Sequence, residues 1–293
     1  MSRRGQMLFV LMGVIWGIPY LLIKVAVRDL SAPTLVFART APAALLLLPV
    51  ALRRNQLRPL LAHWRPVVAY SLIEVAGPWL LLSSAEKRLS SSVAGLLIAT
   101  VPLIGAILGL AVGLQDRLDR RRVLGLLTGL VGVAALVGVD LRGSSLIAVA
   151  EVALTAVGYA VGPMIISRWF ADMPGLGLVA VSLGLTAAIY APLAAVRVPH
   201  HVSGQVLAAV VVLTLLCTAC AFLLFFALIV EVGPARATVI TFINPAVAVS
   251  LGAIVLGEPL TLGIAIGFPL ILAGSFLATG RARTSTPLAT PLQ

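Results

Sequence analysis

The sequence has few charged residues, which make up only 11% of its 293 positions. A soluble globular domain usually carries about 25% charged residues. Hydrophobic residues instead reach 60%, and the mean hydropathy is +1.11. This composition excludes a soluble fold and predicts a chain that lies mostly in lipid.

Cysteine and histidine are also scarce, with two cysteines and three histidines. Cys217 and Cys220 form a C-x-x-C pattern inside an apolar segment, where small thiols are expected to pack between helices. The histidines form no ligand set with nearby acids, so we predict no metal and no cofactor. The chain also has no phosphate-binding glycine loop, no G-x-S-x-G elbow and no H-E-x-x-H motif, which makes a membrane-embedded enzyme the weaker alternative.

Long apolar segments account for nearly the whole chain. Each approaches the roughly 20 residues that a helix needs to cross a hydrocarbon layer about 30 Å thick. The ten predicted spans cover residues 6–27, 33–52, 66–85, 91–114, 123–140, 145–166, 175–196, 206–230, 235–256 and 261–280. We therefore predict an all-α integral membrane protein with ten transmembrane helices, followed by a disordered tail over residues 281–293.

The two halves of the chain resemble each other at an offset of about 143 residues, which pairs Pro102 with Pro245 and Trp16 with Tyr159 or its neighbour. Because five spans precede the repeat, the second copy must enter the membrane from the opposite side. The sequence thus predicts two inverted five-helix repeats, over residues 6–140 and 145–280. Inverted repeats are typical of secondary transporters, which bind their solute near the bilayer midplane.

The net charge of +11 has a topological explanation. With the N-terminus in the cytoplasm, fourteen basic residues fall on the cytoplasmic side and five on the other. The fourteen are Arg3, Arg4, Arg53, Arg54, Arg58, Arg65, Arg117, Arg120, Arg121, Arg122, Arg168, Arg236, Arg281 and Arg283, and the five are Arg28, Lys87, Arg88, Arg142 and Arg197. Positive residues gather on the cytoplasmic side of membrane proteins, so we predict two cytoplasmic termini, a lipid bilayer as partner and no nucleic acid.

Polar residues inside the spans give the best indication of a site, because a charge at mid-membrane costs roughly 2.5 to 3.5 kcal/mol on insertion scales. Arg39, Glu74 and Glu151 fall inside predicted spans, and Lys24 lies near the outer end of the first. We predict that proton coupling, if present, uses Glu74 or Glu151. The predicted substrate-binding residues are Trp16, Tyr20, Arg39, Glu74, Tyr159 and Asn244.

Several of these residues also have structural interpretations. Arg39 and Glu74 are compatible with a buried ion pair. Lys24 is expected to extend outward to the interface, and Asn244 is equally suited to bridge a kinked neighbouring helix. Glu258, just before Pro259, is expected to cap the helix that it precedes. Residues 86–88 are expected to form a solvated turn.

Three motifs in the second half carry a resemblance to a known family. They are Gly233-Pro234-Ala235-Arg236-Ala237, Asn244-Pro245-Ala246-Val247-Ala248 and Leu256-Gly257-Glu258-Pro259-Leu260-Thr261. With Gly13-Val14-Ile15-Trp16-Gly17, they resemble the EamA-type permeases of the drug/metabolite transporter superfamily, over residues 6 to about 280. The resemblance implies a bacterial inner-membrane protein that exports small metabolites such as amino acids or drug-like amines.

The chain departs from the superfamily pattern in two places. Leu114-Gln115-Asp116 stands where the second repeat has Gly257-Glu258. Trp16 lies eight residues before Lys24, where the small multidrug-resistance branch has a proton-coupling glutamate, so proton antiport through this position is not expected. A sugar or nucleotide-sugar carrier is the alternative function, and both a monomer and a homodimer fit the sequence.

Overall fold

The computed structural model describes residues 2–111, 120–140, 145–199, 201–233 and 237–279. Within these ranges every regular element is a helix. The first half contains α1 (Arg3–Ile15), α2 (Ile18–Ala26), α3 (Ala32–Arg53), α4 (Arg58–Leu61), α5 (Trp64–Tyr70), the π-helix η1 (Ser71–Ala76), α6 (Gly77–Ala85), α7 (Ser91–Ile98), α8 (Val101–Ala111) and α9 (Arg120–Asp140). The second half contains α10 (Ser145–Trp169), α11 (Gly175–Val196), α12 (Gly204–Thr214), the π-helix η2 (Leu215–Cys220), α13 (Ala221–Val232), the 3-10 helix η3 (Thr238–Phe242), α15 (Asn244–Leu256) and α16 (Leu262–Thr279).

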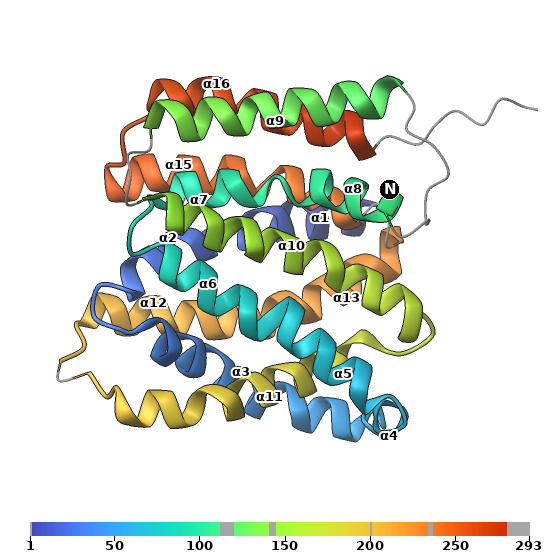
Figure 1. The fold of residues 1–293 in the computed structure, drawn as a ribbon. Helices are drawn as coiled ribbons and strands as arrows, with labels where there is room; N and C mark the ends of the chain where they lie inside the picture. The colour runs from blue at the N-terminus through green and yellow to red at the C-terminus, as the bar shows by residue number, and fades with distance from the viewer. Residues whose placement is uncertain (1, 112–119, 141–144, 200, 234–236, 280–293) are drawn as a thin grey trace, which may run out of the picture.

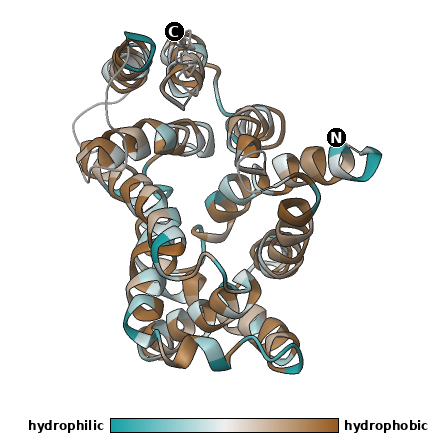
Figure 2. Cartoon of the chain, turned by 90° about the vertical axis from the view of Figure 1, so that its right-hand side faces the viewer, coloured by the Kyte–Doolittle hydropathy of each residue, from teal (hydrophilic) through white to brown (hydrophobic). Residues whose placement is uncertain are grey.

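Nine stretches of the described chain are long and apolar enough to cross a membrane. A further apolar helix, Leu262–Ala278, is shorter. Hydrophobic residues cover most of the helix surfaces (Figure 2), as expected for helices that face lipid. The all-helical membrane fold is therefore confirmed, while the count of ten spans stays a prediction. The predicted tail lies outside the described residues.

The helices run roughly parallel or antiparallel to one another, and their connections gather at two ends (Figure 1). The N-terminus and α4 lie at one end. The turns from α2 to α3, from α6 to α7 and from α11 to α12 lie at the other, which we call the distal end. The first span of the second half, α10, runs opposite to α1 and α2, as an inverted pair requires.

Three predicted spans are divided in two. The first breaks at Trp16 and Gly17 between α1 and α2, the fourth between α7 and α8, and the ninth between η3 and α15. A proline lies at the start of each second piece, at Pro19, Pro102 and Pro245. Proline has no backbone N–H and clashes with the preceding turn, so it begins a helix more easily than it continues one. Broken spans supply backbone groups and kinks at the depth where transporters place their sites.

The two π-helices occupy equivalent places in the two halves. η1 begins about 144 residues before η2, close to the offset of the sequence repeat. Each π-helix contacts the second span of the opposite half. Ser71 of η1 donates to Ser182 Oγ of α11 at 2.9 Å, and Arg39 of α3 donates to Thr218 of η2 at 2.8 Å. π-helical turns often mark functional sites, and here both lie where the two halves meet.

Helices α9 and α16 form a separate, closely packed pair (Figure 1). Glycines make this approach close: a Cβ atom at Gly274 would lie 2.4 Å from the Gly129 nitrogen and 2.6 Å from the Gly125 carbonyl oxygen. Small residues let helix backbones approach closely in lipid, and these glycines do so between α9 and α16.

Candidate functional site

Arg39 of α3 is a buried cation. It lies about two turns into α3, which starts after the N-cap Ser31, and is 8% exposed. Its guanidinium carbon lies 3.7 Å from the centroid of the Trp79 ring, and its Nε donates to Thr218 Oγ1 at 2.8 Å. Arg39 and Glu74 form no ion pair in the structure, so the alternative interpretation of the two as a structural pair is not supported.

Two further predicted site residues lie near Arg39, and a third, Glu74, lies near one of these two. Tyr20 of α2 and Tyr159 of α10 lie within electrostatic range of the guanidinium, and Tyr159 is also near Glu74 of η1. We call Tyr20, Arg39, Glu74, Trp79, Tyr159 and Thr218 the central cluster. Its members come from both halves of the chain, as expected for a site between inverted repeats.

The Glu74 side chain packs against α10 at Gly162. A Cβ atom at Gly162 would overlap the Glu74 carboxyl group, so the glycine makes the room that this carboxyl occupies. Glu74 Oε2 is buried and has no hydrogen-bond partner among the described residues. Tyr70, one helical turn earlier, lies within electrostatic range. An acid held in this way is suited to bind a proton or a cationic group.

Trp16 and Asn244 lie at the helix breaks and make packing contacts there. The Trp16 ring lies 4.6 Å from the Phe225 ring and 5.9 Å from that of Phe222, between centroids. With its nitrogen turned toward the two nearby carbonyls, the Asn244 amide donates to Gly13 at 2.9 Å and to Ile240 at 3.0 Å. Asn244 thus bridges the ninth span to the broken first span, as the structural interpretation predicts.

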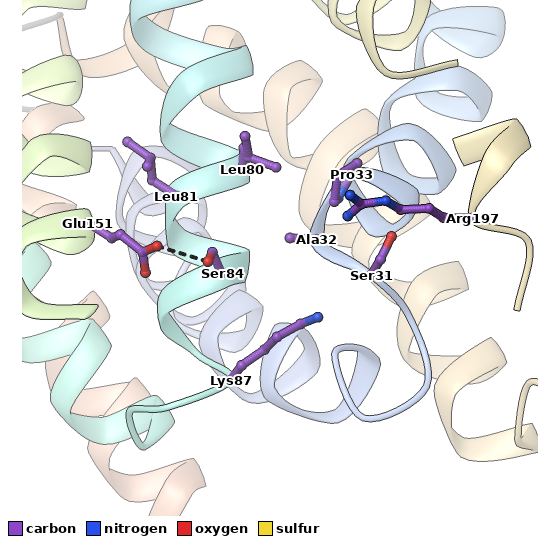
Figure 3. A pocket seen from close by; sticks show the side chains of 9 residues that line it. All are labelled: Ser31, Ala32, Pro33, Leu80, Leu81, Ser84, Lys87, Glu151 and Arg197. Atoms are coloured by element: carbon purple, nitrogen blue, oxygen red, sulfur yellow. Dashed lines mark hydrogen bonds between the residues drawn. The ribbon is translucent and has the colours of Figure 1, made fainter. Parts of the chain in front are cut away.

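Glu151 lies apart from the central cluster, beside a cavity of about 340 Å³ (Figure 3). Its carboxylate accepts from Arg88 Nη2 at 2.5 Å and from Ser84 Oγ at 2.9 Å. The cavity is lined by Ser31, Ala32, Pro33, Leu80, Leu81, Ser84, Lys87, Glu151 and Arg197. Because these residues surround the distal turns, the cavity lies at the distal end.

Lys24 turns inward, contrary to the expectation that it extends to the interface. Its half-buried ammonium donates to the backbone carbonyls of Glu86 and Leu89, each at 2.7 Å. These carbonyls follow the C-terminal end of α6, where the helix dipole attracts a cation. Lys24 therefore holds the first span against the turn between α6 and α7.

The prediction of a solvated turn over residues 86–88 is only partly correct. Lys87 and Arg88 are exposed, but Glu86 is 0% exposed. Glu86 lies seven residues after Trp79, or about two helical turns, and so follows the same face of the span as the central cluster. In the sequence, Glu86 is followed by Lys87 and Arg88, and three charged residues in a row are typical of an exposed turn.

Glu258 is a helix cap, but for a different helix from the one predicted. Its carboxylate accepts from the backbone nitrogens of Ser91 and Ser92, at 2.7 and 3.0 Å, and from their hydroxyls, at 3.0 and 2.6 Å. These groups begin α7, whereas the prediction placed the cap on α16. The interaction crosses the two halves and satisfies donors that a helix start leaves free.

Comparison with known proteins places this arrangement in a family. The sequence profile of the EamA-like transporter family matches residues 3–138 and again 146–280. The "Uncharacterized inner membrane transporter YedA" of Escherichia coli K12 is 28% identical over 255 residues, covering 85% of this chain and 81% of that protein. The "Uncharacterized transporter YvbV" of Bacillus subtilis is 24% identical over 291 residues, covering 96% and 93%.

A solved crystal structure shares the fold. It superimposes with a TM-score of 0.66 at 21% identity, and the match covers 95% of this chain and 97% of the other.

Proposed function

We propose, on the premise that this chain belongs to the EamA-like transporter family, that it exports small metabolites by alternating access through the central cluster. The substrate class is that of amino acids or amphipathic drug-like compounds. The observation that carries this proposal is Arg39, a buried guanidinium that contacts both halves of the chain and forms no ion pair with a carboxylate of the described residues.

The chemistry of the central cluster favours a solute with an anionic or zwitterionic end. Arginine presents a rigid fork of donors that matches a carboxylate, and only Nε is hydrogen-bonded to Thr218. Tyr20, Trp79 and Tyr159 provide aromatic surface for the rest of the solute. A nucleotide sugar would need more cations, and the nearby Lys24 ammonium is occupied by backbone carbonyls.

The arrangement of contacts supports an alternating-access cycle. Two cavities, of about 340 and 220 Å³, lie at the distal end. At the opposite end, Ser2 hydrogen-bonds Glu231 and Gly5 packs against Val232, so that α1 closes on α13. We propose that this conformation faces the distal side and that opening the α1–α13 contact gives the opposite state.

The family relatives include an inner-membrane transporter, which supports a multi-pass membrane protein. We propose a bacterial inner membrane with both termini in the cytoplasm, so that the distal end faces outward. The basic residues of the sequence support this orientation. A monomer and a homodimer both fit the proposal.

If transport is coupled to protons, Glu74 is a better candidate than Glu151. The Glu151 carboxylate already accepts hydrogen bonds from Arg88 and Ser84, outside the central cluster. Within the central cluster, Glu74 has a buried oxygen that no described residue hydrogen-bonds. It also lies in a π-helix, an element that is frequent at functional sites.

A ligand screen followed by a flux assay tests the proposed function. The purified protein is screened for thermal stabilisation by amino acids, amines, sugars and nucleotide sugars, since a bound ligand raises the unfolding temperature. We expect stabilisation by a carboxylate-bearing solute and its transport into or out of proteoliposomes. Stabilisation by sugars alone would favour the alternative carrier, and the absence of flux for every stabilising solute would contradict transport.

A further inference from the structure

Glu86 is a buried acid that the proposed transport mechanism has not used. It follows α6 as its C-cap residue and is 0% exposed. Neither carboxyl oxygen has a hydrogen-bond partner among the described residues. An ionised carboxylate without partners in such a place is costly, because burial removes its hydration and nothing replaces it. Its environment therefore favours the protonated form.

Charged and polar groups from several elements face Glu86. Lys24 of α2 and Arg39 of α3 lie within electrostatic range and favour a negative carboxylate, while Glu258, in the loop after α15, opposes it. The phenols of Tyr20 and Tyr159 also lie within this range. No member of this set hydrogen-bonds to the carboxyl oxygens.

Burial is the largest influence and raises the pKa of the Glu86 carboxyl well above its usual range, although Lys24 and Arg39 act in the opposite direction. This direction agrees with the missing hydrogen bonds. The geometry and the electrostatics both indicate a carboxyl that carries a proton in this conformation.

Glu86 is also one of the residues that line a cavity. A space of about 220 Å³ is lined by Lys24, Val27, Arg28, Glu86 and Lys87. It lies beside the distal turns between α2 and α3 and between α6 and α7. Because Glu86 is itself fully covered, a small movement of the cavity wall must precede contact with water.

We propose that Glu86 is a proton-binding site of this transporter, which exchanges its proton with the distal aqueous phase through this cavity. On release, the O–H bond breaks and the proton passes to water, leaving a carboxylate. The Lys24 ammonium then moves from the carbonyls of Glu86 and Leu89 to pair with that carboxylate. Proton binding reverses the exchange and restores the contact between α2 and the turn after α6.

This inference rests on the proposed function for its role in coupling, but the site can be tested without any solute. Lys24 joins the broken first span to the third span, so its change of partner would move two elements of the central cluster. We expect proton release at Glu86 to loosen the contact between α2 and the turn after α6, and thus to link proton movement to the change of state.

The first test measures thermal unfolding of the full-length protein in detergent from pH 5 to pH 9. A carboxyl whose pKa is raised by folding stabilises the folded state at low pH, and this contribution is lost as the pH rises through the raised pKa. We expect the wild-type unfolding temperature to fall across this range more steeply than that of Glu86→Gln, in which the group stays neutral.

Asp29→Asn is the matched control. Asp29 is an exposed carboxylate at the same end, and hydrogen bonds from Ser203 hold its pKa below the usual value. It is therefore ionised throughout the tested range, and the variant should keep the wild-type slope. If Glu86→Gln fails to fold, Glu86→Asp replaces it and should retain a pH-dependent slope with a shifted midpoint.

The second measurement is the infrared carbonyl band of protonated carboxyl groups during a pH titration. We expect a band that disappears as the pH rises in the wild type and is missing in Glu86→Gln. Equal pH slopes in wild type and Glu86→Gln, with the same carbonyl bands, would overturn the proton site. Failure of solute flux would instead count against transport, because neither measurement here requires a solute.

Discussion

The guanidinium carbon of Arg39 lies 3.7 Å from the centroid of the Trp79 ring, and no carboxylate in the described part of the chain forms an ion pair with it. An aromatic face stabilises a buried cation without neutralising its charge. Arg39 can therefore remain inside the protein and still attract an anionic group. Its hydrogen bond to Thr218 joins the second span of one half to the π-helix of the other. Arg39 therefore supplies both the buried positive charge and a hydrogen bond between the two halves.

Replacing Trp79 should destabilise the folded protein, because Arg39 would lose its aromatic partner. We expect Trp79→Leu to lower the free energy of unfolding by about 2 kcal/mol or more, the size of a desolvated cation–π interaction. Trp79→Phe should lose less, since a ring face remains. Chemical denaturation in detergent measures both. Trp169→Leu, at an exposed position at the end of α10, is the control. If it lowers the free energy of unfolding as much as Trp79→Leu does, the stabilising contact between Trp79 and Arg39 is contradicted.

Replacing Glu74 tests its role in proton coupling. We expect Glu74→Gln to retain solute binding, measured by thermal stabilisation, but to lose the acceleration of flux by a pH gradient. The amide keeps the size of the carboxyl and cannot release a proton. Glu151→Gln should keep the pH response, because Glu151 lies apart from the central cluster and its carboxylate is paired with Arg88. If a pH gradient does not change solute flux in the wild type either, a role of Glu74 in proton coupling is contradicted.

Cysteine labelling tests the orientation of the chain. In a background in which Cys217 and Cys220 are replaced by serine, we expect a cysteine at Arg58 to be labelled only after the membrane is opened. A cysteine at Arg197 should react with an impermeant reagent added from outside. Both arginines are exposed and lie at opposite ends of the molecule. The reverse labelling pattern would place the termini outside.

Glu258 should contribute to stability through α7. We expect Glu258→Gln to lower the free energy of unfolding by about 1 to 3 kcal/mol, because an amide nitrogen would then face donors that now meet a carboxylate. Asp172→Asn, at an exposed position, should change it little. Thermal denaturation measures both variants, and a Glu258→Gln protein as stable as the wild type would contradict the cap.

Much of the fold could be predicted from the sequence, because lipid imposes a simple rule on composition and segment length. A run of about 20 apolar residues has few alternatives to a helix in a bilayer. The divisions of the spans are harder to predict, since proline is also tolerated inside α3 and α10, at Pro42 and Pro163. Whether a proline breaks a span depends on neighbours that can satisfy the freed carbonyls.

Charged residues inside the helix bundle could be predicted where one charged residue interrupts an apolar run, as at Arg39 and Glu74, and their role in a site stays a prediction. The burial of Glu86 was not predictable, because two exposed basic residues follow it and the local pattern is that of a turn. Glu258 illustrates a similar difficulty: its residue type predicts a cap, but the helix that it caps lies about 167 positions away in the sequence. The surroundings of Glu86 and of Glu258 are both formed by residues far away in the sequence. A short local motif therefore cannot predict either of them.

Solute flux in proteoliposomes that contain wild type, Arg39→Lys or Arg39→Ala is the most direct test of the central claim. For the carboxylate-bearing solute that stabilises the protein most, we predict rapid flux with wild type, partial flux with Arg39→Lys and none with Arg39→Ala. Lysine keeps the charge but lacks the fork of donors. Equal flux through a folded, correctly inserted Arg39→Ala protein would contradict the account.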